Sequence, residues 1–247
     1  MAINLNLPKK PGFFIVGTEA GVGKTVVAGA IAKLLTDKGS KVGVFKPIAT
    51  GGIRSWDGVV GKDSKFLAWC SNSDLPLSTI NPQGFVKEGV PLAAAFQEKR
   101  NIDFEKISTA YNEICQDCDV VIVEGVGGTR VPLTNEFDLL DLATAFNLPV
   151  ILVVRHTIEI VNHTLMSVDC IRSAGLEPAG IILNGFNSLD FPAAEENAEQ
   201  IIEHFSNVKI LCGVPFDDEV DIQGPCLGEF TLDMLGNCDW ARLAGFV

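Results

Sequence analysis

A glycine-rich loop that joins a predicted strand to a predicted helix constrains the fold of this chain more than any other feature. The loop runs from Gly17 to Thr25 with the sequence GTEAGVGKT. An apolar run at residues 13–16 precedes it, and a helical pattern over residues 25–36 follows it. In this layout, loop N–H groups and the helix N-terminus face a bound phosphate, the lysine reaches the β- and γ-phosphates, and the next hydroxyl ligates Mg²⁺. The loop therefore predicts a nucleoside triphosphate site with Lys24 and Thr25 at its centre.

The spacing within this loop departs from the common pattern, G-x-x-x-x-G-K-T. Thr18 stands where the first glycine is expected, and Gly17 lies one residue earlier. The strand before the loop and the helix after it argue against a chance Gly-Lys-Thr at a helix start. We interpret the segment as a variant phosphate loop.

Short apolar runs alternate with helix-length segments along most of the chain. Predicted strands cover residues 13–16, 41–46, 120–124, 150–154, 179–183 and 209–214. Predicted helices cover residues 25–36, 104–116, 137–146, 161–173 and 193–205. Continuous apolar runs are typical of strands buried on both faces, so the alternation predicts an α/β fold with a doubly wound, mostly parallel sheet flanked by helices. Residues 50–101 interrupt it as a long insertion, and such segments often carry function.

Length and charge set limits on the class of protein. A chain of 247 residues, 47% of them apolar, is long enough for one large domain, which we take as residues 1–247. The formal net charge of −12 argues against a nucleic-acid surface, which needs clustered lysine and arginine. Residues 1–11 do not resemble a secretion signal, and the longest apolar run is too short to span a membrane. We therefore expect a soluble, cytoplasmic protein without nucleic-acid or membrane partners.

The seven cysteines do not suggest a disulfide framework, because their spacing is irregular and their number is odd. Cys115 and Cys118 form one C-x-x-C motif, but no second pair and no nearby histidine complete a zinc site. A place at the end of a helix, before a buried strand, explains them more simply than a metal or redox role.

Polar residues gather where the predicted strands end. Lys46 follows the second strand, and Glu124 closes the third and is followed by Gly-Val-Gly-Gly. Asn184 and Pro215 follow the fifth and sixth strands. The carboxyl ends of parallel strands meet at one edge of the sheet, where α/β proteins bind ligands. Beside a triphosphate, Lys46 would be a second cation over developing negative charge, and Glu124 would hold Mg²⁺ directly or through water. A surface lysine and a helix-capping or solvated carboxylate are the alternatives without function.

Asp63 lies in the long insertion, at the start of an apolar-periodic stretch at residues 66–69. Its spacing fits a helix N-cap as well as it fits a second carboxylate at the ligand edge. The sequence pattern alone leaves both readings open.

With these motifs in place, the chain resembles the dethiobiotin synthetase family. The resemblance rests on the loop, on Lys46-Pro-x-x-Thr-Gly and on Glu124-Gly-x-Gly-Gly-x-x-x-Pro-Leu, in that order and spacing. It extends from about residue 13 to residue 215 and includes Asn81-Pro82, Asn162-His163 and Gly213-Val214-Pro215. It implies a P-loop NTPase-like fold and an ATP- and Mg²⁺-dependent ligase of biotin biosynthesis.

The resemblance also implies a reaction, which is the carboxylation and ring closure of 7,8-diaminononanoate with CO₂ or bicarbonate to dethiobiotin. The steps pass through a carbamate and a carbamic-phosphoric anhydride. Lys24 and Lys46 would be catalytic, and Thr50 would hydrogen-bond the diamine or its carbamate. The family is dimeric, so we expect a homodimer in which the region of Asn162 and His163 closes the substrate site across the interface.

Two ligand sets follow from the same resemblance. Mg²⁺ would be held by Thr25, Asp63 and Glu124. ATP would be bound by Gly21, Val22, Gly23, Lys24, Thr25, Val26, Asp63, Glu124, Gly125, Val126, Gly127, Asn184, Gly185, Val214, Pro215 and Phe216. Within the second set, Asn184 and residues 214–216 would contact adenine.

Two positions and one longer stretch depart from the common family pattern. Ala20 stands where a phosphate-loop threonine is usual, and Gly185 stands where relatives often carry aspartate beside adenine. Residues 156–161 replace a stretch of the Gly-Leu-Gly-Thr type. If that stretch recognises the carboxylate of the substrate, Glu159 is an unfavourable neighbour, so a changed substrate stays open.

Two other classes of nucleotide-binding protein compete with the synthetase. A partition- or switch-type ATPase typically has a lysine early in the loop, where this chain has Glu19, and binds DNA or membrane through a basic or amphipathic surface. A cobyrinate-type amidoligase carries a glutaminase domain in addition, for which 247 residues leave no room. The synthetase is the favoured function.

Overall fold

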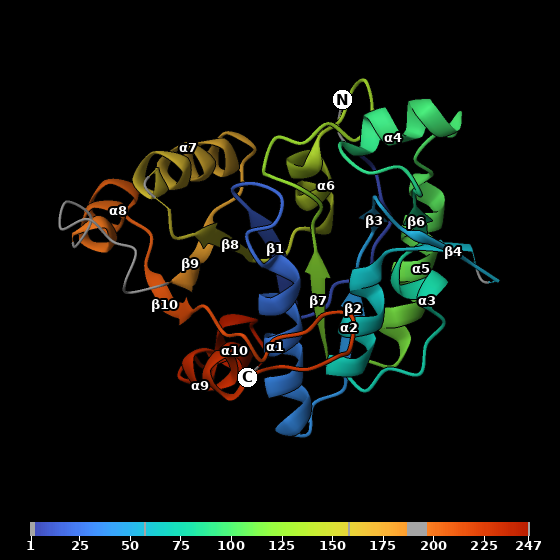
Figure 1. Cartoon of the computed structure of the whole chain (residues 1–247). Helices are drawn as coiled ribbons and strands as arrows, with labels where there is room; N and C mark the ends of the chain where they lie inside the picture. The colour runs from blue at the N-terminus through green and yellow to red at the C-terminus, as the bar shows by residue number, and fades with distance from the viewer. Residues whose placement is uncertain (1–2, 57, 158, 187–196, 247) are drawn as a thin grey trace.

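The computed structural model describes residues 3–56, 58–157, 159–186 and 197–246. Within those residues the main sheet has six strands in the order β10-β9-β8-β1-β7-β2, and every neighbouring pair is parallel. The strands are β1 (Gly12–Gly17), β2 (Val42–Phe45), β7 (Val120–Glu124), β8 (Val150–Arg155), β9 (Pro178–Phe186) and β10 (Ile210–Pro215). Each overlaps a predicted strand, so the predicted α/β fold with a parallel sheet is confirmed (Figure 1).

Helices cover both faces of this sheet because the strands bury side chains on both sides. Along β1, Phe13 and Ile15 face one layer while Phe14 and Val16 face the other, and all four are fully buried. The first layer contains α1 (Lys24–Asp37), α2 (Lys62–Cys70), α9 (Glu229–Gly236) and α10 (Trp240–Leu243). The second layer contains α5 (Phe104–Gln116), α6 (Leu139–Phe146), α7 (Ile160–Ser173) and α8 (Ala198–Ser206). Two-sided burial is why the strands appear in the sequence as unbroken apolar runs.

The helix boundaries follow local capping chemistry. The helix predicted at residues 137–146 begins only at Leu139, because the Asp138 carboxylate caps α6 by accepting hydrogen bonds from the N–H groups of Leu140 (2.8 Å) and Asp141 (3.1 Å). The helices predicted at 25–36, 104–116 and 161–173 agree with α1, α5 and α7 within one residue. The helix predicted at 193–205 corresponds to α8, and residues 193–196 lie outside the described residues. No helix in the described part of the chain is long and apolar enough to cross a membrane.

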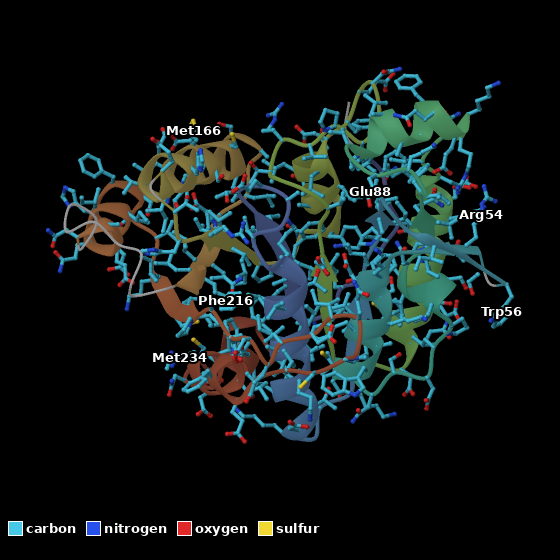
Figure 2. All side chains as sticks on the ribbon, viewed as in Figure 1. Arg54, Trp56, Glu88, Met166, Phe216 and Met234 are labelled. Atoms are coloured by element: carbon cyan, nitrogen blue, oxygen red, sulfur yellow. The ribbon has the colours of Figure 1, made fainter. Side chains whose placement is uncertain are left out.

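The insertion between β2 and α5 contains regular structure that the sequence pattern did not predict. Besides α2, it holds α3 (Leu77–Ile80), α4 (Pro91–Glu98), the parallel pair of β3 (Ile48–Ala49) with β6 (Gln83–Gly84), and a hairpin of β4 (Ile53–Ser55) with β5 (Gly58–Val60). In Figure 1 these elements gather on the side of the sheet that ends in β2. Trp56, which is 96% exposed, projects from the hairpin (Figure 2).

The C-terminal segment completes the layer over the first strand. The indole of Trp240 is 1% exposed and packs edge-on against Phe13, with ring centroids 5.9 Å apart. The Gly12 N–H donates to the carbonyl oxygen of Ala244 at 3.3 Å. Helices α9 and α10 accordingly lie beside α1 (Figure 1).

Candidate functional site

The glycine-rich loop joins β1 to α1 and wraps around the side chain of Lys24. Gly23 is the N-cap of α1 and has a φ of 93°, a left-handed conformation that glycine adopts without steric cost. The buried Lys24 ammonium group donates to the carbonyl oxygens of Glu19 (2.8 Å) and Gly127 (2.6 Å). Gly127 belongs to the glycine-rich segment after β7. Lys24 therefore links the two loops that were predicted to surround the phosphates.

Asn184, at the carboxyl end of β9, holds the loop from the other side. Its Nδ2 atom donates to the carbonyl oxygen of Val22 at 2.9 Å. A Cβ atom added at Gly23 would lie 1.9 Å from the same Nδ2 atom. A larger residue at position 23 would therefore displace the amide as well as strain the backbone.

Side chains from four segments meet at the carboxyl ends of β2 and β7. The Lys46 ammonium group contacts the Glu124 carboxylate, and its Nζ atom lies 3.1 Å from Asp63 Oδ2. The Thr25 hydroxyl donates to Glu124 Oε1 at 2.8 Å. The structure thus brings together Thr25, Lys46, Asp63 and Glu124, four of the predicted site residues.

The position of Asp63 decides between the two readings that the sequence left open. Gly61 is the N-cap of α2, and Asp63 lies in the first turn of that helix without capping it. The N-cap reading is therefore wrong. The Asp63 carboxylate is instead paired with Lys46.

Asn81 is a site residue that the sequence pattern did not single out. Its side chain is 1% exposed, accepts a hydrogen bond from the Gly61 N–H (2.8 Å) and donates to the carbonyl oxygen of Lys46 (2.7 Å). The Asn81 amide thus links Gly61, which precedes the helix that carries Asp63, to Lys46, the residue that Asp63 contacts. The motif Asn81-Pro82 was the available signal, but it says nothing of this distant pairing.

A pocket of about 310 Å³, here called the phosphate pocket, lies over this cluster. Ten predicted site residues line it: Gly21, Gly23, Lys24, Thr25, Lys46, Thr50, Asp63, Glu124, Val126 and Gly127. Ala20, Ala49 and Ile222 complete the lining. The Thr50 hydroxyl donates to the carbonyl oxygen of Gly89 at 2.9 Å.

The other predicted ligand residues lie outside this lining, and they are Val22, Val26, Gly125, Asn184, Gly185, Val214, Pro215 and Phe216. Most of them form one group at the ends of neighbouring strands, because Val214 on β10 pairs with Asn184 on β9. Phe216 follows β10 and is 72% exposed (Figure 2). This group adjoins the loop through the contact of Asn184 with Val22.

Burial and neighbouring charges act differently on the ionisable groups of the pocket. Burial lowers the pKa of Lys24 to about 8, and the Lys46 ammonium adds to this effect. Burial also disfavours the charged form of Lys46, but the carboxylates of Glu124 and Asp63 outweigh it and hold the pKa of Lys46 above its usual value. Burial raises the pKa of Glu124, against the opposing effect of Lys46. An anion that enters the pocket would therefore favour the charged form of Lys24.

The Glu124 carboxylate has an unused ligand atom. Its Oε2 atom is buried and has no hydrogen-bond partner among the described residues. Such an atom is costly in a protein interior, and a cation beside it removes the cost. Thr25 and Asp63 add oxygen ligands of the type that Mg²⁺ prefers. The described residues contain no group of three His, Cys, Asp or Glu side chains placed to hold a metal. Proteins usually bind Mg²⁺ through one or two carboxylates together with substrate phosphates.

Sequence relatives decide the family. A family model described as an AAA domain matches residues 11–223. The ATP-dependent dethiobiotin synthetase of Bacillus cereus strain G9842 is 35% identical over 220 residues, which cover 89% of this chain and 86% of that protein. The chain belongs to the dethiobiotin synthetase family. The ATP-dependent dethiobiotin synthetase of Bacillus subtilis strain 168 is 35% identical, over 83% of this chain and 84% of that protein. The ATP-dependent dethiobiotin synthetase of Methanococcus vannielii is 32% identical, over 80% of this chain and 90% of that protein.

The fold of this dethiobiotin synthetase family member is also found in solved ATPase structures. The cell division ATPase MinD of Pyrococcus furiosus superposes with a TM-score of 0.56 at 16% identity, covering 96% of this chain and 98% of that one. The septum site-determining protein MinD of Pyrococcus horikoshii, complexed with Mg-ADP, gives a TM-score of 0.58 at 17% identity over 96% and 95% of the two chains. The predicted P-loop fold is thereby confirmed.

The departures from the dethiobiotin synthetase pattern have different places in the structure. Ala20 lines the phosphate pocket and offers it no hydroxyl group. Glu159 is exposed and directly precedes α7, and no described residue of the 156–161 stretch lines the phosphate pocket. Residue 158 lies outside the described residues. The described residues of the altered stretch therefore contribute no side chain to the phosphate pocket.

Proposed function

We propose that this chain synthesises dethiobiotin by the ATP-dependent carboxylation and ring closure of 7,8-diaminononanoate with CO₂. The names of its relatives support the product and the nucleotide. One structural observation carries the proposal: the Lys46 ammonium lies between Glu124 and Asp63 at a pocket that also contains Lys24. Two cations at one small pocket suit a reaction in which a phosphoryl group passes between two oxygens.

The phosphate loop would bind the triphosphate of ATP. The N–H groups of residues 21–26 lie where β1 leads into α1, so the helix dipole also favours the anion. Lys24 donates to two loop carbonyls in this structure and would exchange them for phosphate oxygens. The backbone of residues 125–127 would approach the nucleotide from the β7 side.

Lys46 would act on the charge that moves during the reaction. One amine of the substrate takes up CO₂ as a carbamate, whose oxygen attacks the γ-phosphorus of ATP while the bond to the β–γ bridging oxygen breaks. ADP leaves, and the second amine then attacks the carbonyl carbon of the carbamic-phosphoric anhydride, releases phosphate and closes the ring. Thr50 lines the same pocket and would hydrogen-bond the diamine or its carbamate.

Mg²⁺ would be held by Thr25, Asp63 and Glu124, and the unpartnered Oε2 atom of Glu124 supports this assignment. When bound, the ion would neutralise charge on the phosphates. Lys46 shares both carboxylates with the ion, so it would keep them in place before nucleotide arrives.

Adenine would lie against the group formed by Asn184, Gly185 and residues 214–216. The contact of Asn184 with the loop supports this location, since it places the strand ends of β9 and β10 beside the phosphate site. The exposed ring of Phe216 offers a surface on which a base stacks. On the family resemblance, we further propose one domain over residues 1–247, a homodimer and a cytoplasmic location.

The test of the substrate is stimulation of ADP release. Purified protein with MgATP should release ADP faster when diaminononanoate and bicarbonate are both present, and dethiobiotin should appear in equal amount. If neither substrate changes the rate, the substrate assignment is wrong, and a switch-type ATPase becomes the better reading.

The test of Lys46 compares two lysine variants. Lys46→Ala should abolish product while ATP still binds, because Lys24 and the loop hold the phosphates. Lys41→Ala is the matched control, since Lys41 is exposed and its ammonium group pairs with the surface carboxylate of Asp117 at 2.6 Å. ATP affinity by calorimetry, with circular dichroism to check folding, separates binding from chemistry. Wild-type turnover by a folded Lys46→Ala protein would contradict the assigned role.

A further inference from the structure

One residue separates the phosphate pocket from a second pocket beside it. The second pocket, here called the cationic pocket, has a volume of about 340 Å³. Among the described residues that line these two pockets, Ile222 is the only one common to both. Its side chain packs against the buried apolar cluster to which α1 and α2 contribute. Ile222 therefore forms a partition between the two pockets.

The cationic pocket is polar and open to water. Its lining includes Arg54, Lys62, Lys65 and Gln223, and all four of these residues are exposed. Long charged side chains keep their charged groups in water, and amide groups at a surface are hydrated in the same way. Water therefore fills this pocket up to the side chain of Ile222.

The phosphate pocket has few apolar side chains with which to exclude that water. The apolar residues of its lining are Ala20, Ala49, Val126 and Ile222, and Ile222 is the largest of them. The other lining residues are glycines or carry hydroxyl, ammonium or carboxylate groups. On the side that faces the cationic pocket, one branched side chain thus stands between a bound triphosphate and water.

Hydrogen bonds fix the turn that carries Ile222. Asp221 and Cys226 exchange two backbone hydrogen bonds, of 3.1 and 2.9 Å. The segment that leads to this turn begins at Asp217, whose buried carboxylate accepts from the N–H (3.1 Å) and the hydroxyl (2.9 Å) of Thr231. In Figure 1 this segment runs from the end of β10 past α1 toward α2. Ile222 is thereby held in place without being part of a helix or strand.

We propose that Ile222 keeps water from the γ-phosphorus of bound ATP and so directs the phosphoryl group to the carbamate. The inference deepens the proposed function and rests on it. In the competing reaction, a water oxygen attacks the γ-phosphorus while the bond to the β–γ bridging oxygen breaks, which yields ADP, phosphate and a proton. Exclusion of water suppresses such side reactions and strengthens the electrostatic interactions at the reacting group. On this assignment Ile222 is a specificity-determining residue for the phosphoryl acceptor.

The experiment measures ADP and dethiobiotin together, with MgATP, diaminononanoate and bicarbonate all present. Wild-type protein should form the two products in equal amounts. In Ile222→Ala, which opens the partition, the ratio of ADP to dethiobiotin should rise to about 2 or more, because water competes with the carbamate. ADP release without the diamine should rise as well, while the KM for ATP changes little, because Lys24 and the loop still hold the phosphates.

Control variants separate the partition from general effects on the fold. Ile53→Ala is the matched substitution, since Ile53 lines the cationic pocket but not the phosphate pocket and is 58% exposed. It should keep the wild-type ratio of products. Valine and threonine have nearly the same shape, but threonine replaces a methyl group with a hydroxyl that binds water. Ile222→Val should therefore stay close to the wild-type ratio, whereas Ile222→Thr should form excess ADP, with the same circular dichroism spectrum for both.

The outcomes distinguish this assignment from the proposed function. If folded Ile222→Ala and Ile222→Thr still form ADP and dethiobiotin in equal amounts, the assignment of Ile222 is overturned and the proposed function stands. An equal excess of ADP in Ile53→Ala overturns the assignment in the same way. Wild-type protein that forms no dethiobiotin overturns the proposed function, and this assignment with it.

Discussion

Substitution of Gly23 by alanine should weaken the folded state more than the same change at Gly21. Both glycines have positive φ, 93° and 78°, so an added Cβ costs roughly 1–2 kcal/mol at either position. Only at position 23 does the Cβ also meet another group, Asn184 Nδ2 at 1.9 Å, whereas nothing lies within 4 Å at position 21. Displacing that amide breaks its hydrogen bond to Val22, which adds about 0.5–1.5 kcal/mol.

The free energy of unfolding should therefore fall by about 1.5–3.5 kcal/mol for Gly23→Ala and by about 1–2 kcal/mol for Gly21→Ala. In a chain of this size, each kcal/mol of lost stability lowers the melting temperature by roughly 2–4 °C. Alanine also restricts the unfolded chain, but this effect is common to both variants and cancels in the comparison. Urea unfolding followed by circular dichroism measures the two free energies.

A double variant isolates the contact with Asn184. If the amide is what the new Cβ displaces, the costs of Gly23→Ala and Asn184→Ala should be less than additive, because the second change removes the group that the first one strikes. Gly21→Ala with Asn184→Ala should be additive within about 0.5 kcal/mol. Equal costs for the two glycine variants, or additive costs at position 23, would refute the reasoning.

Three further outcomes follow from the structure. Asn81→Ala leaves two buried backbone groups without partners, so urea unfolding should show a loss of about 2–4 kcal/mol, and a change below about 0.5 kcal/mol would contradict the bridging role. Glu124→Gln removes the proposed Mg²⁺ ligand, so the Mg²⁺ concentration for half-maximal ADP release should rise at least about 10-fold, and an unchanged requirement would exclude Glu124 as a ligand. Iodoacetamide at pH 8 should modify the exposed Cys226 and spare Cys70, as peptide mass spectrometry would show, because burial raises the pKa of Cys70 from 9.0 to about 12. Since this folded-state pKa is raised, the neutral thiol stabilises the fold below pH 9, and that contribution should be lost as the pH rises toward 12.

Lys46 and Glu124 were predictable as neighbours because their proximity follows from the sheet alone. β2 and β7 are adjacent and parallel, with Phe45 opposite Val123, so the next residue of each strand meets at the same edge. The apolar runs that define the strands and the phosphate loop carry this information locally. Strand ends and loop motifs were therefore enough to place the centre of the site.

Asp63 and Asn81 were not predictable in the same way, because each reaches the site through contacts distant in sequence. The spacing of Asp63 fitted a helix N-cap equally well, but the N-cap of α2 is Gly61. Asn81 acts through a buried amide whose partners lie 20 and 35 residues away. Periodicity and turn signals describe local backbone preference and contain none of these pairings.

The position of the C-terminal segment has a consequence for protein synthesis. Phe13 emerges early from the ribosome, but the indole that covers it belongs to Trp240, and Ile222 supplies one wall of the phosphate pocket. At 5–20 residues per second, translation separates Phe13 from Trp240 by roughly 10–45 s. During that interval Trp240 does not yet cover Phe13, so this side of β1 is accessible to chaperones. The phosphate pocket lacks the wall that Ile222 supplies until residue 222 has been synthesised. Stabilisation by ATP is therefore available to the finished chain and not to the nascent one.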